Sequence, residues 1–288
     1  MVRRAGGVAP PDLRQGRRAM TALYVLGSGS RGNCCAVEHD GAAILIDAGF
    51  SPREIERRAE TTGLALGSVG AIVLTHEHGD HARGAGRLAR RLGVPVLTAP
   101  GTWGRIAPRM RHAEHRALSL CTRVEIGPFV VTACPTSHDA AEPLALAVET
   151  AGGARIGVAY DLGRATAAVR YLLRQLTAIV LEANHDDVLL RTSRYPPVVQ
   201  QRIAGSSGHL SNRAAAALLT EVHHPGLDVV VLAHLSRQCN TANDARATVA
   251  SALRLVRFGG TLHVAEQDEP LGPIPVVPRA GMQLGLAL

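Results

Sequence analysis

The sequence predicts a layered α/β fold, because strand-like and helix-like segments alternate along the chain and acidic or histidine residues recur where strand-like segments end. Rigid strands can hold such side chains in a fixed geometry while the adjoining loops stay open to a substrate. With 288 residues, of which 46% are apolar, the chain can bury one sizeable core or at most two small ones. These features are typical of a globular α/β enzyme.

The N-terminal third of the chain contains apolar segments that stop at turn residues. We expect strands at residues 22–26, 34–38, 42–47, 70–75 and 94–98. The first strand leads into a glycine-rich turn at 27–33, and Asp40-Gly41 joins the next two strands. Ser51 followed by Pro52 predicts a helix with Ser51 as its N-cap, and a later helix is expected to stop at Gly93.

The rest of the chain continues the alternation of strands and helices. Four strand-like segments are separated by turn residues between 123 and 160. We then expect helices at 164–175, 211–221 and 242–256 and strands at 228–233 and 261–264. Either Ser211 or Asn212 would cap the second of these helices.

The expected organisation is a single domain at 21–266 with a disordered basic tail at 1–20 and an irregular Pro/Gly-rich tail at 267–288. The net charge is +7, of which +4 comes from Arg3, Arg4, Arg14, Arg17 and Arg18 against Asp12. The remaining +3 is weak evidence for nucleic-acid binding, because a solvated basic tail accounts for the excess equally well.

Composition excludes several mechanisms and compartments. Histidine aside, every basic residue is Arg, so a P-loop lysine, a Schiff-base lysine and a Ser-Lys pair are all excluded. The five cysteines are an odd number without Cys-x-x-Cys spacing, which favours a reducing cytoplasm over a disulfide framework. No apolar run reaches the ~18 residues of a membrane span, and the first residues lack a secretory apolar region.

One cluster of residues carries the strongest chemical signal. His76, His78, Asp80 and His81 place four potential metal ligands within six residues, on the loop that leaves a buried strand. A metal site needs ligands that converge on one point, so a dense cluster on a turn suits it. Imidazole and carboxylate together favour zinc, with manganese or iron also possible.

The pattern His-x-His-x-Asp-His is the signature of the metallo-β-lactamase superfamily, which the chain resembles over residues 22–265. The further motifs of that family are matched in order by Asp47, His138, Asp161 and His234. The resemblance implies a four-layer αββα sandwich with the site at one edge of its two sheets.

The same resemblance implies a role for each residue in a site of two divalent metal ions, with Zn²⁺ favoured and Mn²⁺ possible. The first ion would be held by His76, His78 and His138, the second by Asp80, His81 and His234, and Asp161 would bridge both. Asp47 would orient the signature loop through hydrogen bonds. A hydroxide between the ions would be the nucleophile, so Asp80 counts among the catalytic residues as well.

Three further segments resemble the YycJ/WalJ-type branch of the superfamily, whose members are described as cytoplasmic DNA exonucleases. They are residues 26–34, 181–186 and 208–212. Glu182 and His209 also resemble a pair found in the tRNA-processing RNase Z. Phosphodiester cleavage expels an alkoxide, and a His held protonated by a carboxylate can supply the proton it needs. The alternative is structural, with Glu182 as a cap or ion-pair partner and His209 at a helix start.

Two local features are open at this point. Ser28, Ser30 and Asn33 of the glycine-rich turn could donate hydrogen bonds to a phosphate, but a plain tight turn explains them equally well. Arg31 and Arg237 are candidates for phosphate contact by position. After His234-Leu235-Ser236 the branch carries an acidic residue and Asn, whereas this chain has Arg237-Gln238-Cys239-Asn240.

The function favoured by the sequence is a metal-dependent phosphodiesterase that acts on nucleic acid, with DNA favoured and exonuclease action expected. The alternative is a metallohydrolase of a small ester, thioester or lactam, which would use the same metal site. A non-catalytic binding protein ranks last, because every expected ligand position is filled.

Overall fold

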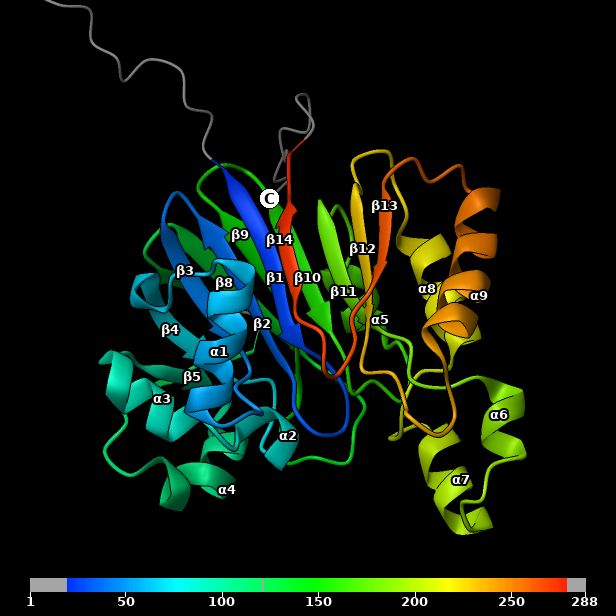
Figure 1. The fold of residues 1–288 in the computed structure, drawn as a ribbon, viewed down its shortest axis with the longest axis horizontal. Helices are drawn as coiled ribbons and strands as arrows, with labels where there is room; N and C mark the ends of the chain where they lie inside the picture. Colours follow the sequence, from blue (N-terminus) through cyan, green and yellow to red (C-terminus); the bar gives the residue numbers. More distant parts are fainter. Residues whose placement is uncertain (1–19, 121, 279–288) are drawn as a thin grey trace, which may run out of the picture.

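Two sheets of seven strands form the centre of the computed structural model, which describes residues 20–120 and 122–278 (Figure 1). The first sheet contains, in spatial order, β14 (Leu271–Pro275), β1 (Thr21–Gly27), β2 (Cys34–His39), β3 (Ala42–Ile46), β4 (Val69–Val73), β5 (Val96–Thr98) and β6 (His115–Ala117). The second contains β13 (Thr261–Val264), β12 (Val229–Ala233), β11 (Ala178–Glu182), β10 (Arg155–Ala159), β9 (Leu144–Thr150), β8 (Phe129–Pro135) and β7 (Arg123–Ile126).

Helices cover the outer faces of both sheets (Figure 1). On the first sheet these are α1 (Pro52–Thr62), α3 (Ala85–Leu92) and α4 (Pro100–Met110), with the short α2 (Gly79–Ala82) on the signature loop. On the second sheet they are α5 (Ala167–Leu172), α8 (Asn212–Val222) and α9 (Ala242–Leu255), while α6 (Asp187–Arg191) and α7 (Pro197–Ala204) project away from the sheets. None of the described helices is long and apolar enough to cross a membrane.

Three apolar layers hold these elements together. The side chains of β1 alternate between two of these layers. Leu23 and Val25 enter the layer between the sheets, and Leu26 enters the layer under α1 and α3. A third layer lies between the second sheet and α5, α8 and α9. Because both faces of each sheet are buried, the central strands are apolar almost throughout. The predicted four-layer αββα sandwich is confirmed.

Local predictions agree with the structure where capping and turn residues are strong. The region 123–160 contains four strands, as expected. The Ser51 hydroxyl accepts a hydrogen bond from the Glu54 amide at the start of α1. Of the two candidate caps of α8, Ser211 is the N-cap, and its hydroxyl accepts from the Ala214 amide.

The prediction that residues 267–288 are irregular is wrong for 271–275, which form β14. This strand pairs antiparallel with β1, and its Ile274 is buried. The prolines in this segment argue against a strand, but β14 lies at the edge of its sheet, where a missing N–H costs little. Residues 1–19 and 279–288 lie outside the described residues, so the expected tails there stay predictions.

β11 is absent from the expected strands, although it lies in the middle of the second sheet between β10 and β12. All five of its residues are buried. A short run that is buried on both faces shows no alternation, so flanking turn residues must mark it. No Gly or Pro separates β11 from the helix before it, whereas Pro225-Gly226 precedes the equally buried β12, which was predicted. The helices α4, α6 and α7 were likewise not expected.

We expect Ile274→Ala to lower the free energy of unfolding by about 2–4 kcal/mol, because it removes a buried side chain from the layer between the sheets. Val277→Ala is the matched control, since Val277 is 52% exposed, and it should change the stability by less than about 0.5 kcal/mol. Urea denaturation measures both. Equal effects of the two substitutions would show that β14 does not contribute to the core.

Candidate metal centre

Histidine and carboxylate side chains meet at one edge of the sandwich, where parallel strands end. Asp47 follows β3 and the signature loop follows β4, and these two strands are parallel. Asp161, Glu182 and His234 lie at the ends of β10, β11 and β12, which are also parallel. His138 follows β8. The groups whose ligand atoms lie within 4.8 Å of one another are His76/His78/His138, His76/His81/Asp161, Asp80/His81/His234 and Asp161/Glu182/His209/His234.

The backbone turns sharply at three of these residues. Asp47, Asp161 and His234 have φ angles of 61°, 54° and 56°, in the left-handed region. This region costs a non-glycine residue about 1–2 kcal/mol. The turn ends each strand. The fold therefore accepts local backbone strain at three positions that place candidate metal ligands or their hydrogen-bond partners.

Four histidine rings are oriented by an oxygen atom behind them. The Nδ1 atoms of His76, His81, His138 and His234 lie 3.0, 2.7, 3.1 and 3.1 Å from Thr75 Oγ1, Asp47 Oδ2, the Gly208 carbonyl and Glu182 Oε1, respectively. Each Nδ1–H can donate to that oxygen, which leaves the Nε2 lone pair free. This is how metal-binding histidines are usually held.

The free ring nitrogens converge. His76 Nε2 lies 3.0 Å and His138 Nε2 lies 3.4 Å from Nδ1 of His78. Two buried atoms at the centre form no well-aligned hydrogen bond: Asp161 Oδ2, which lies 2.7 Å from Nε2 of His81, and His234 Nε2. Buried polar atoms without a well-placed partner are costly, and a cation among them would satisfy them.

The electrostatic balance of the cluster also favours cations. Among the described residues, only histidines form ion pairs with Asp47, Asp80, Asp161 and Glu182. Burial lowers the pKa of His234, but Asp161, Asp80 and Glu182 outweigh it and raise this pKa to about 10. The pKa of His81 is likewise raised by Asp161 and Asp47, against the effect of burial.

The residues present therefore fit divalent metal ions. The raised histidine pKa values reflect a surplus of negative charge, which protons or metal ions can neutralise. A donor set of imidazole and carboxylate suits zinc and manganese.

Glu182 connects the cluster to His209. Its Oε1 accepts from Nδ1 of His209 at 2.7 Å and from Nδ1 of His234 at 3.1 Å, and its Oε2 accepts from the amides of Leu162 and Leu210 at 2.8 and 2.9 Å. Glu182 therefore both orders the backbone and orients two histidines. The two interpretations of this residue drawn from the sequence are compatible.

The charges of this pair reinforce each other. Burial raises the pKa of Glu182, but the charge and hydrogen bond of His209 outweigh it and leave this pKa at about 2. Burial lowers the pKa of His209, but Glu182 raises it above its usual value. The His209 side chain is 21% exposed, so a protonated ring can present its other nitrogen to a bound group.

The glycine-rich turn is a tight turn rather than an open phosphate cradle. The Asn33 carbonyl oxygen Oδ1 accepts from the Ser28 hydroxyl and the Gly29 amide, both at 2.9 Å, and the Ser28 hydroxyl accepts from the His234 amide at 2.8 Å. The Arg31 guanidinium pairs with Asp268. Ser28 and Asn33 are used within the protein, so the tight-turn interpretation is supported for them, whereas the Arg31–Asp268 pair is exposed and Arg31 stays a candidate by position. Ser30 and Arg237 are exposed.

Thr75 and Asn240 were not among the site residues expected from the sequence. The Thr75 hydroxyl donates to Asp47 Oδ2 at 2.8 Å and faces Nδ1 of His76, so it links two site residues. Its place at a strand end, directly before the signature, was an available signal. The Asn240 amide donates to the carbonyls of Ala183 and Asn184, so it orders the backbone after β11. It does so although residues 237–239 differ from those of the YycJ/WalJ-type branch.

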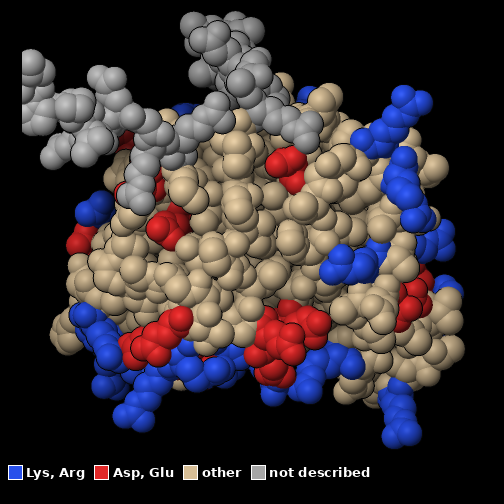
Figure 2. Space-filling model, turned by 45° about the horizontal axis from the view of Figure 1, so that its top comes forward, with Lys and Arg blue, Asp and Glu red and all other residues tan. Residues whose placement is uncertain are grey.

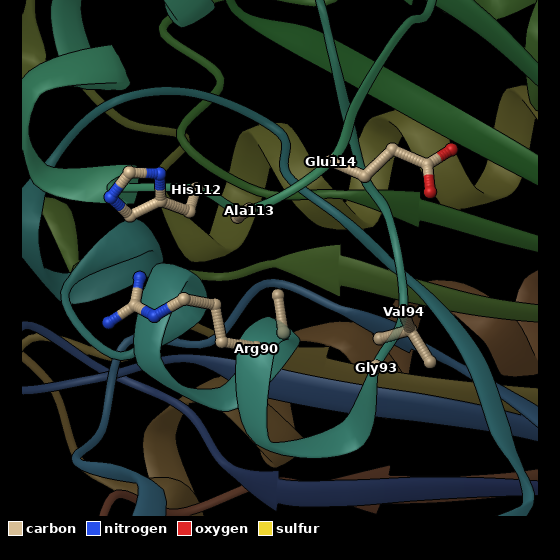
Figure 3. Close-up of a pocket in the computed structure, with 7 residues that line it drawn as sticks. Arg90, Gly93, Val94, His112, Ala113 and Glu114 are labelled. Carbon is tan, nitrogen blue, oxygen red and sulfur yellow. The ribbon is translucent and has the colours of Figure 1, made fainter.

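A separate hollow of about 370 Å³ lies beside α3 and does not belong to this centre (Figure 3). Arg90 lines it, but the Arg90 guanidinium donates to the carbonyls of Met110 and Arg111, both at 2.7 Å. His112 lies near Arg90, whereas Glu114 points away from both. The lining contains no member of the histidine and carboxylate cluster.

An αββα sandwich that gathers histidines and carboxylates at the ends of its strands defines the class of metal-binding hydrolase folds. Residues 27–233 match the model of the metallo-beta-lactamase superfamily. The chain belongs to this superfamily, and the family and fold expected from the sequence are confirmed.

Curated relatives are similar over most of their length. The exodeoxyribonuclease YycJ of Bacillus anthracis is 32% identical over 238 residues, which cover 82% of this chain and 90% of that protein. The exodeoxyribonuclease WalJ of Streptococcus pneumoniae is 26% identical over 240 residues, which cover 82% and 89%.

Solved structures share the fold at low sequence identity. The metallo-beta-lactamase fold protein YhfI from Bacillus subtilis has a TM-score of 0.67 at 16% identity and covers 88% of this chain and 99% of that one. The short form of human tRNase Z has a TM-score of 0.59 at 16% identity, with the same coverage.

We expect Asp47→Asn to weaken the affinity for Zn²⁺ or Mn²⁺ by roughly 10–100-fold. The neutral amide would no longer supply the negative charge that holds the His81 ring or the oxygen that accepts from the Thr75 hydroxyl. Calorimetric titration of the metal-free protein measures the affinity. Glu125→Gln removes an exposed carboxylate from β7 and should leave it unchanged. An unchanged affinity in Asp47→Asn would show that Asp47 does not support the metal ligands.

Proposed function

We propose that the protein is a metal-dependent phosphodiesterase whose substrate is nucleic acid, with DNA favoured and cleavage from a chain end. The observation that carries this proposal is the Glu182–His209 pair at 2.7 Å, placed directly beside the histidine and carboxylate cluster. The names of the relatives YycJ and WalJ support DNA as the substrate and exonuclease action.

In this proposal the cluster binds two divalent ions, Zn²⁺ or Mn²⁺. His76, His78 and His138 would hold one ion, Asp80, His81 and His234 would hold the other, and Asp161 would serve as a ligand to both. Two of the close groups of ligand atoms have the same members as these two sets, which supports the assignment. The buried thiols of Cys34, Cys35 and Cys239, which form no disulfide, support the proposed cytoplasmic location.

The bound ions would supply an activated water and neutralise charge on the attacked phosphate. The protein's own residues would do the rest. Glu182 stays ionised and keeps the proton on His209, because the pKa of the first is lowered and that of the second is raised. His209 can then donate this proton to the sugar oxygen that leaves, and regain one from solvent. A thioester has less need of such an acid, because a thiolate leaves readily without a proton.

The nuclease activity is tested on end-labelled single- and double-stranded DNA and RNA with Zn²⁺ or Mn²⁺. We expect the wild type to shorten DNA from an end, and Asp80→Ala to lose this activity, because Asp80 contributes a ligand atom to the cluster. The label pattern gives the polarity. A metal-loaded wild type that hydrolyses a small ester but cleaves neither DNA nor RNA would contradict the proposal.

We expect His209→Ala to lower kcat on DNA by roughly 10²–10⁴-fold, the contribution of a general acid. The loss should be smaller on a nitrophenyl phosphodiester, whose leaving group needs no proton. His112→Ala, an exposed histidine outside the cluster, is the control. Equal losses on both substrates would assign His209 to binding rather than to proton transfer.

A further inference from the structure

We infer that residues 188–207, here called the arm, bind the backbone phosphates of a nucleic-acid strand that leads to the metal centre. The arm contains most of α6 and all of α7, and it projects from the lower right of the molecule in Figure 1. The inference rests on the proposed function, since it assigns a surface to the substrate of that site.

The charge of the arm is distinctive. It contains Arg191, Arg194 and Arg202 and no Asp or Glu, which gives a charge of +3. Residues 20–278 as a whole carry only +2, because the net +7 includes +4 from residues 1–19 and +1 from Arg279. The rest of the described chain therefore sums to −1, which includes −2 from Asp186 and Asp187 where α6 begins, so the arm carries a local excess of basic residues beside two acidic ones.

The arm contributes little to the core. No residue of α7 is buried, and Val198 is 71% exposed. Within the arm only Leu190 is buried. Val199, Gln200 and Ile203 are only partly buried, so α7 adds little to the core and leaves most of its surface for contact with a partner.

The base of the arm is fixed to the loops that carry site residues. The Ser137 hydroxyl donates to the Ser206 carbonyl at 2.6 Å, beside His138. A Cβ on Gly163 would lie 2.3 Å from the same carbonyl, so only glycine allows this approach two residues after Asp161. The arm therefore has a fixed position relative to the metal centre.

Arg202 connects the arm to the entrance of the centre. Its Nε lies 3.2 Å from Oδ2 of Asp139, the neighbour of His138, and its side chain is 76% exposed. An exposed ion pair of this kind contributes little stability, so a phosphate can take the place of Asp139 as partner.

Nucleic acid fits this surface better than other partners. A strand with its terminal phosphodiester at the metal centre must run across the adjoining surface, and arginines there can contact the next phosphates. Aromatic residues are 3% of the chain, so contacts to the backbone rather than stacked bases must dominate. Figure 2 shows basic side chains along the lower edge of the molecule, interspersed with acidic ones, and one basic group projecting at the lower right.

The test compares the double variant Arg191→Ala/Arg194→Ala with Arg174→Ala/Arg254→Ala. The control removes the same charge from exposed positions outside the arm. Fluorescence anisotropy measures binding of a labelled 20-nucleotide phosphorothioate DNA strand to the metal-loaded full-length proteins over a range of NaCl concentrations. We expect about 3–10-fold weaker binding for the arm variant and a salt slope lower by about 1–2, because each lost phosphate contact removes ~0.7. The control should stay within about twofold of the wild type.

Cleavage provides a second readout. The ratio of kcat/KM for a 20-nucleotide strand to that for a dinucleotide should fall by about 3–10-fold in the arm variant, because only the longer strand reaches the arm.

Binding and salt slope equal to those of the control would overturn the role of the arm, leave the proposed nuclease function intact, and point to an acidic protein as its partner. A wild type that binds the strand but cleaves no nucleic acid would contradict the proposed function instead, while arm-dependent binding would still support the arm.

Discussion

The burial of four carboxylates at one edge of the sandwich is the constraint on which the rest of the structure depends. Asp47 and Glu182 are fully buried, Asp161 is nearly so, and Asp80 is partly covered. Burying an unpaired carboxylate costs several kcal/mol, and here only histidines pair with these groups among the described residues. The histidines must therefore be held close to them, and the remaining negative charge makes this edge a place for cations.

The α/β sandwich meets this constraint through its strand directions. Parallel strands end at the same edge of each sheet, and both sheets bring that edge to one place, so side chains distant in sequence converge there. The left-handed residues Asp47, Asp161 and His234 stop their strands at the required point. The apolar layers on both faces of the sheets provide the stability that offsets this local strain.

Glu182 is where structure and chemistry meet. One of its oxygens fixes two backbone amides and the other is shared by His209 and His234. Glu182 thus both pairs with His209 and orients His234, a proposed metal ligand. A change at Glu182 would disturb the proposed proton donor and the proposed metal ligand together, whereas a change at His209 removes no hydrogen bond of His234.

Much of the fold could be predicted from the sequence, because capping residues and strand endings are local signals. Ser51 caps its helix as its position indicated, Ser211 is the one of two candidate caps that the structure selects, and the four strands between 123 and 160 are present. β11 was not recognised, because no Gly or Pro separates its apolar run from the helix before it, whereas Pro225-Gly226 marks the start of the equally buried β12. β14 was hidden by its prolines, which only the edge position in the sheet makes acceptable.

For the site, the sequence by itself determined that His76, His78, Asp80 and His81 lie close together. Four candidate ligands within six residues stay near one another in space whatever the rest of the chain does. Tertiary structure alone decided how distant residues act on one another. Glu182 is 27 residues from His209 and 52 from His234, and no spacing rule predicts that one oxygen accepts from both rings. The glycine-rich turn likewise had two interpretations until Asn33 was placed inside it, because a hydrogen-bond donor is free only when no other part of the chain uses it.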